Sequence, residues 1–153
     1  NFSSLEEGDI DDVWEYNICD NLHHFASQTF EKIAIRYLKQ LNRKRELPFY
    51  FTQIGRQWGK VTRQNTKGQK YTAQEEIDIL ATDKDKTKYI LGECKLTNEP
   101  FDLAQFKALL AKNSYSTNCY YYLFSLNGFT DALINCAKLE NNIFLVSLND
   151  MFI

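Results

Sequence analysis

The sequence predicts an α/β fold in which a mixed β-sheet is flanked by helices. Strand-like segments cluster between residues 49 and 96, and further strands then alternate with helical segments. The chain has 153 residues, of which 44% are hydrophobic and 25% are charged. These values are typical of one globular domain with a sizeable core.

Two helices are expected before the sheet. Residues 9–22 are rich in acids and carry a partial apolar face, formed by Ile10, Val13, Trp14 and Ile18. Ser27 is expected to cap a second helix that continues to Leu41, because apolar residues recur there with the helical period. The segment NRKRELP ends this helix, with Pro48 as the stop.

Three strands are expected in the middle of the chain. Residues 49–54 (FYFTQI) are apolar, and the following GRQWGK contains two glycines that permit a turn or a bulge. Residues 63–72 are polar and predict a loop. Residues 77–82 and 88–96 form the next two strands, with the lysine-rich segment DKDKTK between them.

The second half of the chain alternates helices and strands. In order, these are a helix at 101–112 after Pro100, a strand at 119–125 (CYYYLFS), a helix at 131–139 and a strand at 143–148 (IFLVSL). The first of these strands is dense in β-forming residues, which indicates burial on at least one face. Asn127 and Gly128 predict a turn, and Thr130 is expected to cap the last helix.

Composition narrows the classes of function. The sequence contains no apolar run of transmembrane length and no signal peptide, so no membrane association is expected. The four cysteines lie far apart without a C-x-x-C pair. This spacing argues against a zinc ribbon and favours a reducing cytoplasm. The first residue is Asn, which suggests a fragment of a longer protein.

Charge is distributed unevenly along a chain whose net charge is −2. Residues 6–20 contain seven acids and no Lys or Arg. Residues 47–74 contain no acid and five bases, which are Arg56, Lys60, Arg63, Lys67 and Lys70. A basic segment between two elements suits phosphate groups. The alternative is a solvated loop with scattered lysines.

The hairpin of residues 77–82 and 88–96 determines where its charges lie. If its turn is centred between Asp85 and Lys86, Asp78 faces Glu93 across the strands. One face then carries Glu76, Asp78, Glu93 and Lys95, and the other carries Ile77, Ile79, Ile90, Cys94 and Leu96. A shift of one residue would separate Asp78 from Glu93, so the prediction depends on the register.

Facing carboxylates require compensation. Two of them ~4 Å apart repel by about 4 kcal/mol at an effective dielectric near 20. Lys95 offsets this in part, and a divalent cation does so more fully, with Mg²⁺ or Mn²⁺ favoured over zinc by hard oxygen ligands. The alternative is a structural salt-bridge cluster in which Glu76 pairs with Lys95. Glu31 lies at the edge of the apolar stripe of its helix and either finds a partner or reaches water.

These residues resemble a known superfamily. Asp78 followed by Glu93-x-Lys95 across a hairpin, after a helix bearing Glu31, resembles the PD-(D/E)XK nuclease-like proteins. Four longer segments resemble the C-terminal domain of unknown function found on archaeal-type AAA+ ATPases: TFEKIAIRYL (29–38), IGRQWG (54–59), EIDILATD (76–83) and LGECKL (91–96). This resemblance covers about residues 25–150.

The resemblance implies a restriction-endonuclease-like fold, with a central mixed β-sheet between helices, for residues 25–153. It also implies an N-terminal P-loop ATPase in the parent protein. That ATPase is not part of this sequence, which contains no G-x-x-x-x-G-K-[ST] motif. Residues 1–24 are then an acidic helical segment that packs on the domain or leads to the ATPase. The superfamily's proline before the first aspartate is replaced here by Ile77.

The resemblance also implies roles for individual residues. Asp78 and Glu93 correspond to the metal-binding carboxylates, and the main-chain carbonyl of Cys94 corresponds to a further ligand. Lys95 corresponds to the lysine that positions or activates the attacking water. Glu31 corresponds to the helix glutamate that completes the acidic cluster. The implied cofactor is Mg²⁺ or Mn²⁺.

The expected function is metal-dependent hydrolysis of a nucleic acid, with DNA favoured over RNA. Arg56, Lys60 and Arg63 are expected to contact phosphates, and Trp58 either stacks on a base or packs against the core. The alternative is an inactive nuclease-fold module that binds nucleic acid or protein and regulates the ATPase. A homo-oligomer is compatible with either function.

Overall fold

The computed structural model describes residues 19–152. Its elements are α2 (Cys19–Arg43), β1 (Gln53–Gln64), β2 (Lys70–Thr82), β3 (Tyr89–Lys95), α3 (Leu103–Ala111), β4 (Cys119–Ser125), α4 (Asp131–Leu139), β5 (Ile143–Ser147) and the 3-10 turn η3 (Asn149–Met151). The five strands form one sheet in the order β1-β2-β3-β4-β5. The first three strands are antiparallel, and β3, β4 and β5 are parallel.

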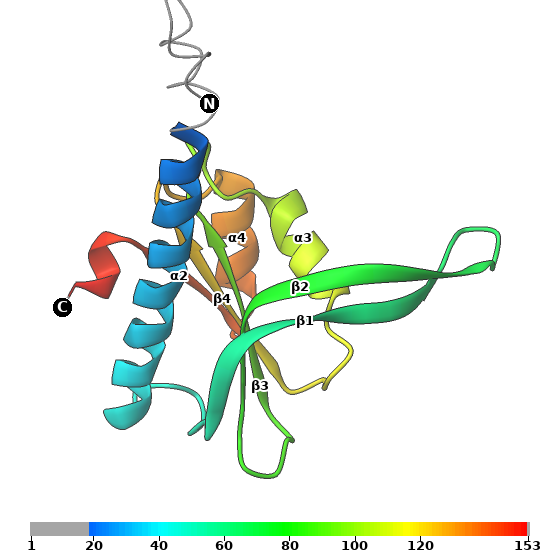
Figure 1. Cartoon of the computed structure of the whole chain (residues 1–153). Coiled ribbons are helices and arrows are strands. Elements are labelled where there is room, and N and C mark those ends of the chain that lie inside the picture. Colours follow the sequence, from blue (N-terminus) through cyan, green and yellow to red (C-terminus); the bar gives the residue numbers. More distant parts are fainter. Residues whose placement is uncertain (1–18, 153) are drawn as a thin grey trace, which may run out of the picture.

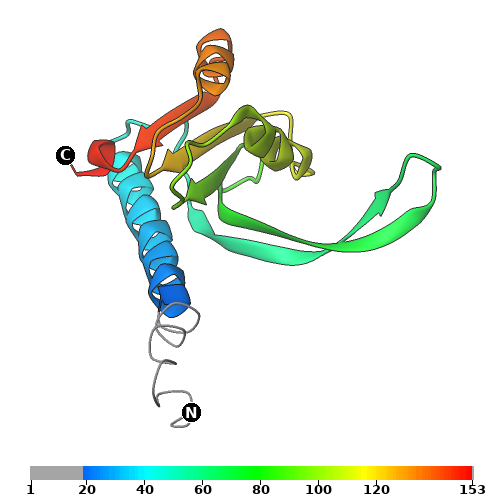
Figure 2. The same ribbon diagram turned by 90° about the horizontal axis from the view of Figure 1, so that it is seen from above.

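Helices cover both faces of this mixed sheet (Figures 1 and 2). Helix α2 packs on one face, where Phe30, Ala34 and Leu38 are buried against the sheet. Helices α3 and α4 cover the other face, with Phe106 and Leu133 in that core. The predicted α/β architecture is therefore confirmed. Within residues 19–152, no helix combines the length and the hydropathy that a bilayer crossing requires.

Strand β4 shows why the middle of the sheet can be predicted from the sequence. Its consecutive side chains enter the two cores alternately: Tyr122 and Phe124 face α2, whereas Tyr121 and Leu123 face α3 and α4. A parallel strand that is buried on both faces needs a continuous apolar run. The segment CYYYLFS supplies that run, and its observed bounds match the prediction.

Helix α2 differs from the prediction at its beginning. It runs without interruption from Cys19 to Arg43, so Ser27 lies inside the helix and does not cap it. No glycine or proline occurs within these bounds to break the helix. Of the acidic helix predicted at residues 9–22, only 19–22 are described, and they belong to α2. Helix α2 thus crosses the boundary between residues 24 and 25.

The segment after α2 is fastened to that helix by one buried side chain. The Asn42 amide donates to the carbonyl of Phe51 and accepts from its N–H, each over 3.0 Å. Phe51 itself is buried in the α2-side core. Residues 49–52 therefore lead into the sheet, and the predicted strand at 49–54 is wrong except for its last two residues.

Strands β1 and β2 form a long ribbon that extends beyond the rest of the sheet (Figure 1). Their pairing continues as far as Gln64 opposite Lys70, so the loop predicted at residues 63–72 is confined to the turn between these two residues. The Asn65 side chain accepts from two main-chain N–H groups of that turn. Gly68 adopts a φ of 77°, which favours glycine.

A β-bulge interrupts the ribbon where it joins the body. Gly55 pairs with Leu80 and Gln57 pairs with Ile77, so two residues of β2 stand opposite the single residue Arg56. Such a bulge changes the side toward which the following side chains point. Ile79 consequently lies in the α2-side core, whereas Ile77 lies in the core of α3 and α4. The prediction that both isoleucines share a face is therefore wrong.

The predicted register of the β2–β3 hairpin is confirmed. Its ladder pairs Ile79 with Gly92 and Thr82 with Tyr89, as a turn centred between residues 85 and 86 requires. Asp83 holds the turn, because its carboxylate accepts from the N–H groups of Thr87 and Lys88. A Cβ on residue 92 would lie 2.9 Å from the Cβ of Ile79, so only glycine fits this position without displacement.

Helix α4 begins where expected, whereas α3 begins two residues later than the predicted start at residue 101. Asp102 caps α3 in a capping box with Gln105, which places the first helical residue at Leu103. The Thr130 side chain accepts from the N–H of Leu133 and caps α4, as predicted. Helix α3 connects β3 to β4, and α4 connects β4 to β5. Such crossover connections are what parallel strand pairs require.

Candidate functional site

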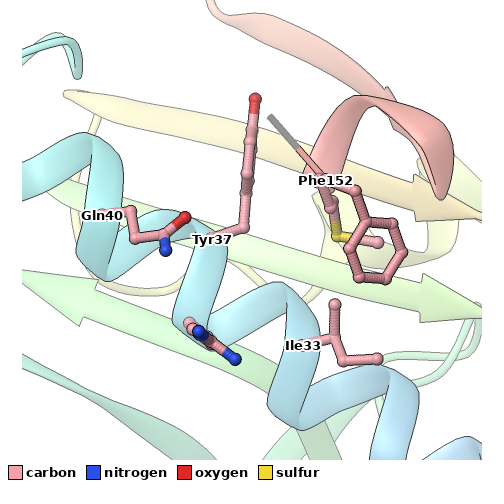
Figure 3. Close-up of a pocket in the computed structure, with 6 residues that line it drawn as sticks. Ile33, Tyr37, Gln40 and Phe152 are labelled. Atoms are coloured by element: carbon pink, nitrogen blue, oxygen red, sulfur yellow. The ribbon is translucent and has the colours of Figure 1, made fainter.

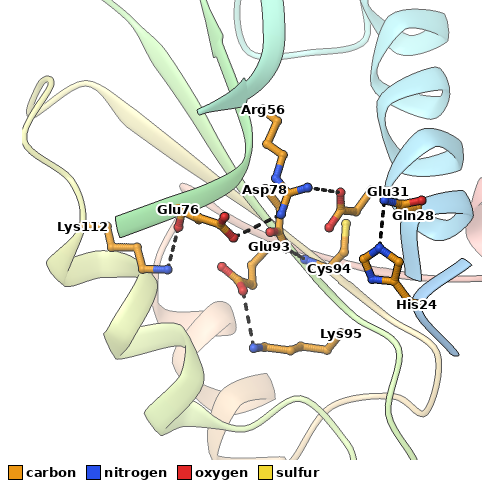
Figure 4. A network of polar contacts seen from close by, with 10 residues as sticks. All are labelled: His24, Gln28, Glu31, Arg56, Glu76, Asp78, Glu93, Cys94, Lys95 and Lys112. Carbon is orange, nitrogen blue, oxygen red and sulfur yellow. Dashed lines mark hydrogen bonds and ion pairs between the residues drawn. The ribbon is translucent and has the colours of Figure 1, made fainter. Parts of the chain in front are cut away.

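The candidate site lies where β2 separates from β3. The ladder between these strands ends at Ile79 and Gly92, just before Asp78 and Glu93. The side chain of Asp78 continues the contact, because its Oδ2 accepts from the N–H of Cys94 over 3.0 Å (Figure 4). The bulge at Asp78 and Ile79 therefore holds a carboxylate against the edge of β3.

Glu93 is largely enclosed at this junction. Its side chain is 13% exposed, and its Oε1 lies 3.4 Å from the Nζ of Lys95. Burial, followed by the negative charge of Asp78, raises the pKa of the Glu93 carboxyl. Lys95 and Lys112 act in the opposite direction but do not cancel that rise. Burial at this junction therefore favours the protonated form of Glu93, whereas a bound cation would favour the charged form.

Glu31 approaches the same junction from α2. Its side chain is 21% exposed and lies 3.9 Å from Nη1 of Arg56. Partial burial, followed by the charge of Asp78, raises the pKa of the Glu31 carboxyl, whereas Arg56 opposes that rise. Asp78 consequently raises the pKa of a carboxyl on each side, Glu31 and Glu93.

The ion pairs differ from the salt-bridge arrangement considered above. Glu76 does not pair with Lys95: its carboxylate lies 3.1 Å from Nη2 of Arg56, and Lys95 pairs with Glu93. The bulge explains the exchange of partners, because it sets Arg56 opposite the surplus residue of β2. Arg56 thereby connects Glu76 on β2 with Glu31 on α2 (Figure 4).

The structure thus brings together all the residues that the sequence assigned to the cation and to water activation. Glu31, Asp78, Glu93, Lys95 and the main chain of Cys94 surround one junction (Figure 4). Of the three bases assigned to phosphate contacts, only Arg56 lies in this cluster. Arg63 is bound by both carboxylate oxygens of Glu75, and Lys60 is exposed on the ribbon. The roles assigned to these residues remain predictions.

Two residues of the site have contacts that the sequence does not predict. Lys112, at the C-terminal end of α3, donates to the carbonyl of Glu76 over 2.7 Å, and its charge opposes the rise in the pKa of Glu93. Arg56 was assigned to phosphates and not to the carboxylate cluster. No local pattern predicts either contact, since Lys112 is 36 residues from Glu76 in the sequence.

The donor set fits a hard divalent cation. Asp78 and Glu93 supply carboxylate oxygens, and the carbonyl of Cys94 supplies a further one on the same side of β3. This follows because the N–H and C=O of one residue point to the same neighbouring strand. Cys94 donates toward β2, and the carbonyl of the next residue, Lys95, accepts from Leu126 after β4.

Water would have to complete the coordination of such a cation. Among residues 19–152, no three His, Cys, Asp or Glu side chains gather at metal-ligand spacing. Mg²⁺ commonly keeps several waters and binds through one or two carboxylates, so this donor set suits it better than zinc, which needs more side-chain ligands. The negative charge of Asp78 contributes to the raised pKa of Glu93, and a cation held between the two carboxylates would offset that repulsion.

A separate hollow lies on another flank of α2. It has a volume of about 170 Å³ and is lined by Ile33, Arg36, Tyr37, Gln40, Met151 and Phe152 (Figure 3). Helical geometry puts Ile33 and Gln40 on the flank of α2 away from Glu31. This hollow is therefore not part of the carboxylate site.

Comparisons with known proteins place the chain in a family. Residues 1–110 match the model of DUF234, described as "Archaea bacterial proteins of unknown function". The uncharacterized protein MJECL04 of Methanocaldococcus jannaschii is 34% identical over 95 residues, which make up 62% of this chain and 18% of that protein. The chain thus spans less than a fifth of the length of this curated relative.

Two solved structures are similar to part of this chain. A protein of unknown function, AF1548, aligns over 77% of this chain and 57% of its own, with 15% identity and a TM-score of 0.41. A repair endonuclease from Pyrococcus abyssi aligns over 60% of this chain and 38% of its own, with 19% identity and a TM-score of 0.36.

Proposed function

We propose a nuclease function for this chain, which belongs to the DUF234 family of archaeal and bacterial proteins. The reaction is the Mg²⁺- or Mn²⁺-dependent hydrolysis of a phosphodiester in nucleic acid, with DNA favoured. One observation carries the proposal: Asp78 and Glu93 share a junction with the Cys94 main chain, beside a paired lysine. The resemblance to the PD-(D/E)XK proteins supports the same conclusion.

Asp78, Glu93 and the carbonyl of Cys94 would hold the cation. When bound, the cation supplies a Lewis acid that lowers the pKa of a bound water and neutralises charge on the phosphate. Asp78 is fixed for this role by its hydrogen bond to the N–H of Cys94. Glu31 adds negative charge from α2, which strengthens the attraction of the site for a cation.

Lys95 acts as a donor and a positive charge. Its ammonium lies 3.4 Å from Oε1 of Glu93. From this position it orients the attacking water or stabilises the negative charge that develops on the phosphate. Its side chain is 29% exposed, so a phosphate at the surface is within its reach.

The parent protein is the proposed first partner. The resemblance to domains on AAA+ ATPases supports a nuclease module beside an ATPase portion, working in the cytoplasm. The chain corresponds to 18% of the length of MJECL04, which leaves most of that protein outside the match. Self-association of the parent is compatible with this arrangement.

A second function is favoured by Arg56. This cation already pairs with Glu31 and Glu76 and thereby neutralises part of the cluster without a metal. The corresponding function is an inactive nuclease-fold module that binds nucleic acid or protein and regulates the ATPase. The two functions differ in what a divalent cation does to the protein.

Cleavage and metal binding together test the proposal. Purified protein is incubated with single-stranded, duplex and branched DNA and with RNA, in Mg²⁺, Mn²⁺ or EDTA. We expect metal-dependent cleavage that Asp78→Asn and Lys95→Ala abolish. Lys138→Ala removes an exposed lysine from α4 and should cleave like the wild type. In parallel, metal should raise the melting temperature of the wild type and not that of Asp78→Asn.

The two functions give different results. Metal-dependent stabilisation with no cleavage of any substrate would favour an inactive module that has kept its cation. The nuclease proposal fails if neither cleavage nor stabilisation by metal is seen, or if Lys95→Ala cleaves as well as the wild type does.

A further inference from the structure

The β1–β2 ribbon has two unlike faces beyond the bulge. One face is partly covered, and its Arg63 is bound by Glu75. Every side chain on the other face is exposed. We call it the open face, and it consists of Trp58, Lys60, Thr62, Gln64, Lys70, Thr72, Gln74 and Glu76. Paired residues of antiparallel strands point to the same side, which defines this set.

The open face leads directly into the carboxylate site. Trp58 is paired with Glu76 across the ribbon. The carboxylate of Glu76 contacts Arg56, and Arg56 reaches Glu31 on α2. A ligand lying along this face would therefore end beside Asp78, while the ribbon projects beyond the rest of the sheet (Figure 2).

We infer that the open face binds a single strand of nucleic acid, with one base stacked on Trp58 and phosphates held by Lys60 and Lys70. This inference deepens the proposed function and rests on it for the position of the strand relative to the site. The indole of Trp58 is a large apolar group, yet the residue is 63% exposed. Stacking with a base is the interaction that such an exposed ring offers to nucleic acid.

Charge on the open face complements phosphate. Within residues 19–152, neither Lys60 nor Lys70 lies in an ion pair, and the only acid of this face, Glu76, is bound by Arg56. Lys67 adds a third positive charge at the turn of the ribbon. Arg56 and Arg63 are engaged by carboxylates, which makes the lysines better placed than the arginines to neutralise phosphates.

The composition of the open face argues against a protein partner. The centres of protein–protein interfaces are rich in apolar and aromatic groups and poor in lysine. Here one indole stands among lysines, threonines and glutamines. A single strand is favoured over a duplex because bases in a duplex are stacked on one another and present no free face to an indole.

Binding can be measured without cleavage. A labelled oligothymidylate is titrated with protein in EDTA, and fluorescence anisotropy gives the dissociation constant. Trp58→Ala should weaken binding about tenfold or more, and Trp58→Phe should retain most of it. Lys60→Ala with Lys70→Ala should weaken binding. It should also reduce the magnitude of the slope of log K against log salt concentration by about 1.4, because each neutralised phosphate of a single strand contributes about 0.7 to that slope.

A charge-matched variant serves as the control. Lys32→Ala with Lys39→Ala also removes two positive charges, but from an exposed face of α2. This variant should bind the oligonucleotide like the wild type. The chain contains two tryptophans, so in a Trp14→Phe background all tryptophan fluorescence comes from Trp58. Addition of the oligonucleotide should quench that fluorescence. Equal melting temperatures will show that each variant is folded.

Several results would overturn the inference. These are equally weakened binding in the ribbon and α2 variants, unchanged binding by Trp58→Ala, or tighter binding of duplex than of single strand. A dimer in sedimentation that Trp58→Ala dissociates, without any oligonucleotide binding, would assign the open face to a protein contact. Asp78→Asn should lose cleavage and keep binding, so failure of the nuclease proposal is distinguishable from failure of this one.

Discussion

The body of the sheet and the β1–β2 ribbon are built from the same kind of strand but are held in different ways. In β3 and β4, side chains are buried against helices on both faces. In the outer ribbon, the pairing of β1 with β2 continues while most side chains stay exposed. Burial therefore fixes the body of the sheet, whereas main-chain pairing and one turn fix the ribbon.

The largest contrast is expected from removing a side chain in each region. Phe124→Ala empties a fully buried position in β4 and should destabilise the protein by about 3–5 kcal/mol. Val61→Ala, on the ribbon, should cost about 1 kcal/mol or less, mainly through lower β propensity. Urea unfolding of both variants measures the difference. Equal destabilisation would show that the ribbon has a packed core of its own.

Two glycines give the next contrast. Gly92→Ala would put a Cβ 2.9 Å from that of Ile79, so we expect destabilisation of about 1–3 kcal/mol. Gly59 has no atom within 4 Å of an added Cβ, and Gly59→Ala should stay within about 0.5 kcal/mol of the wild type. Unfolding midpoints in denaturant test both. If Gly92→Ala is as stable as the wild type, β2 and β3 can move apart at the site with little cost in free energy.

A smaller effect is expected at the β2–β3 turn. The hydrogen bond from the Thr87 hydroxyl, with further main-chain N–H donors, lowers the pKa of Asp83 to about 2 from a usual value of 3.8. This stabilisation is present above the unfolded pKa and is lost as pH falls through about 2. Asp83→Asn should therefore melt lower than the wild type near neutral pH, and the gap should close in acid. A gap that is independent of pH would contradict this prediction.

The smallest expected effect has the opposite sign and lies in the candidate site. Burial and the charge of Asp78 raise the pKa of Glu93, so the folded state holds the proton more tightly than the unfolded state. Stability contributed by Glu93 is thus present below the unfolded pKa and is lost as pH rises through the folded value. Without metal, Glu93→Gln should gain stability relative to the wild type as pH rises.

Divalent metal should reverse that order. Mg²⁺ or Mn²⁺ should stabilise the wild type near neutral pH and leave Glu93→Gln unchanged, which melting curves in metal and in EDTA will show. Glu140→Gln, at the exposed end of α4, is the matched control and should respond like the wild type. If both variants respond alike to metal, Glu93 is not a ligand.

The same contrast explains how much of the fold could be predicted. Strand β4 was predictable because burial on two faces leaves a continuous apolar run, and α4 because Thr130 supplies its cap. Residues 63–72 predict a loop because exposed strands need no apolar alternation, yet the ends of this segment are paired in the ribbon. Ser27 predicts a cap, but a serine is compatible with both the start and the interior of a helix.

The candidate site was predictable to the extent that it depends on one hairpin. A turn at residues 85 and 86 fixes the register, and the register brings Asp78 close to Glu93 and Cys94. The bulge was not predictable, since it depends on how β1 pairs with β2 over a distance in the chain. The partners of Arg56 and Lys112 follow from that bulge and from the packing of α3, and neither leaves a local signal.

The bulge at Asp78 and Ile79 also separates two kinds of change during evolution. Because it fixes the junction, residues inserted or deleted in matched pairs farther out, one on each strand, would lengthen or shorten the ribbon and leave the carboxylates in place. An unmatched change on the inner side would instead rotate the acids away from each other. The length of the ribbon can thus differ between relatives of this protein while the geometry at its base stays the same.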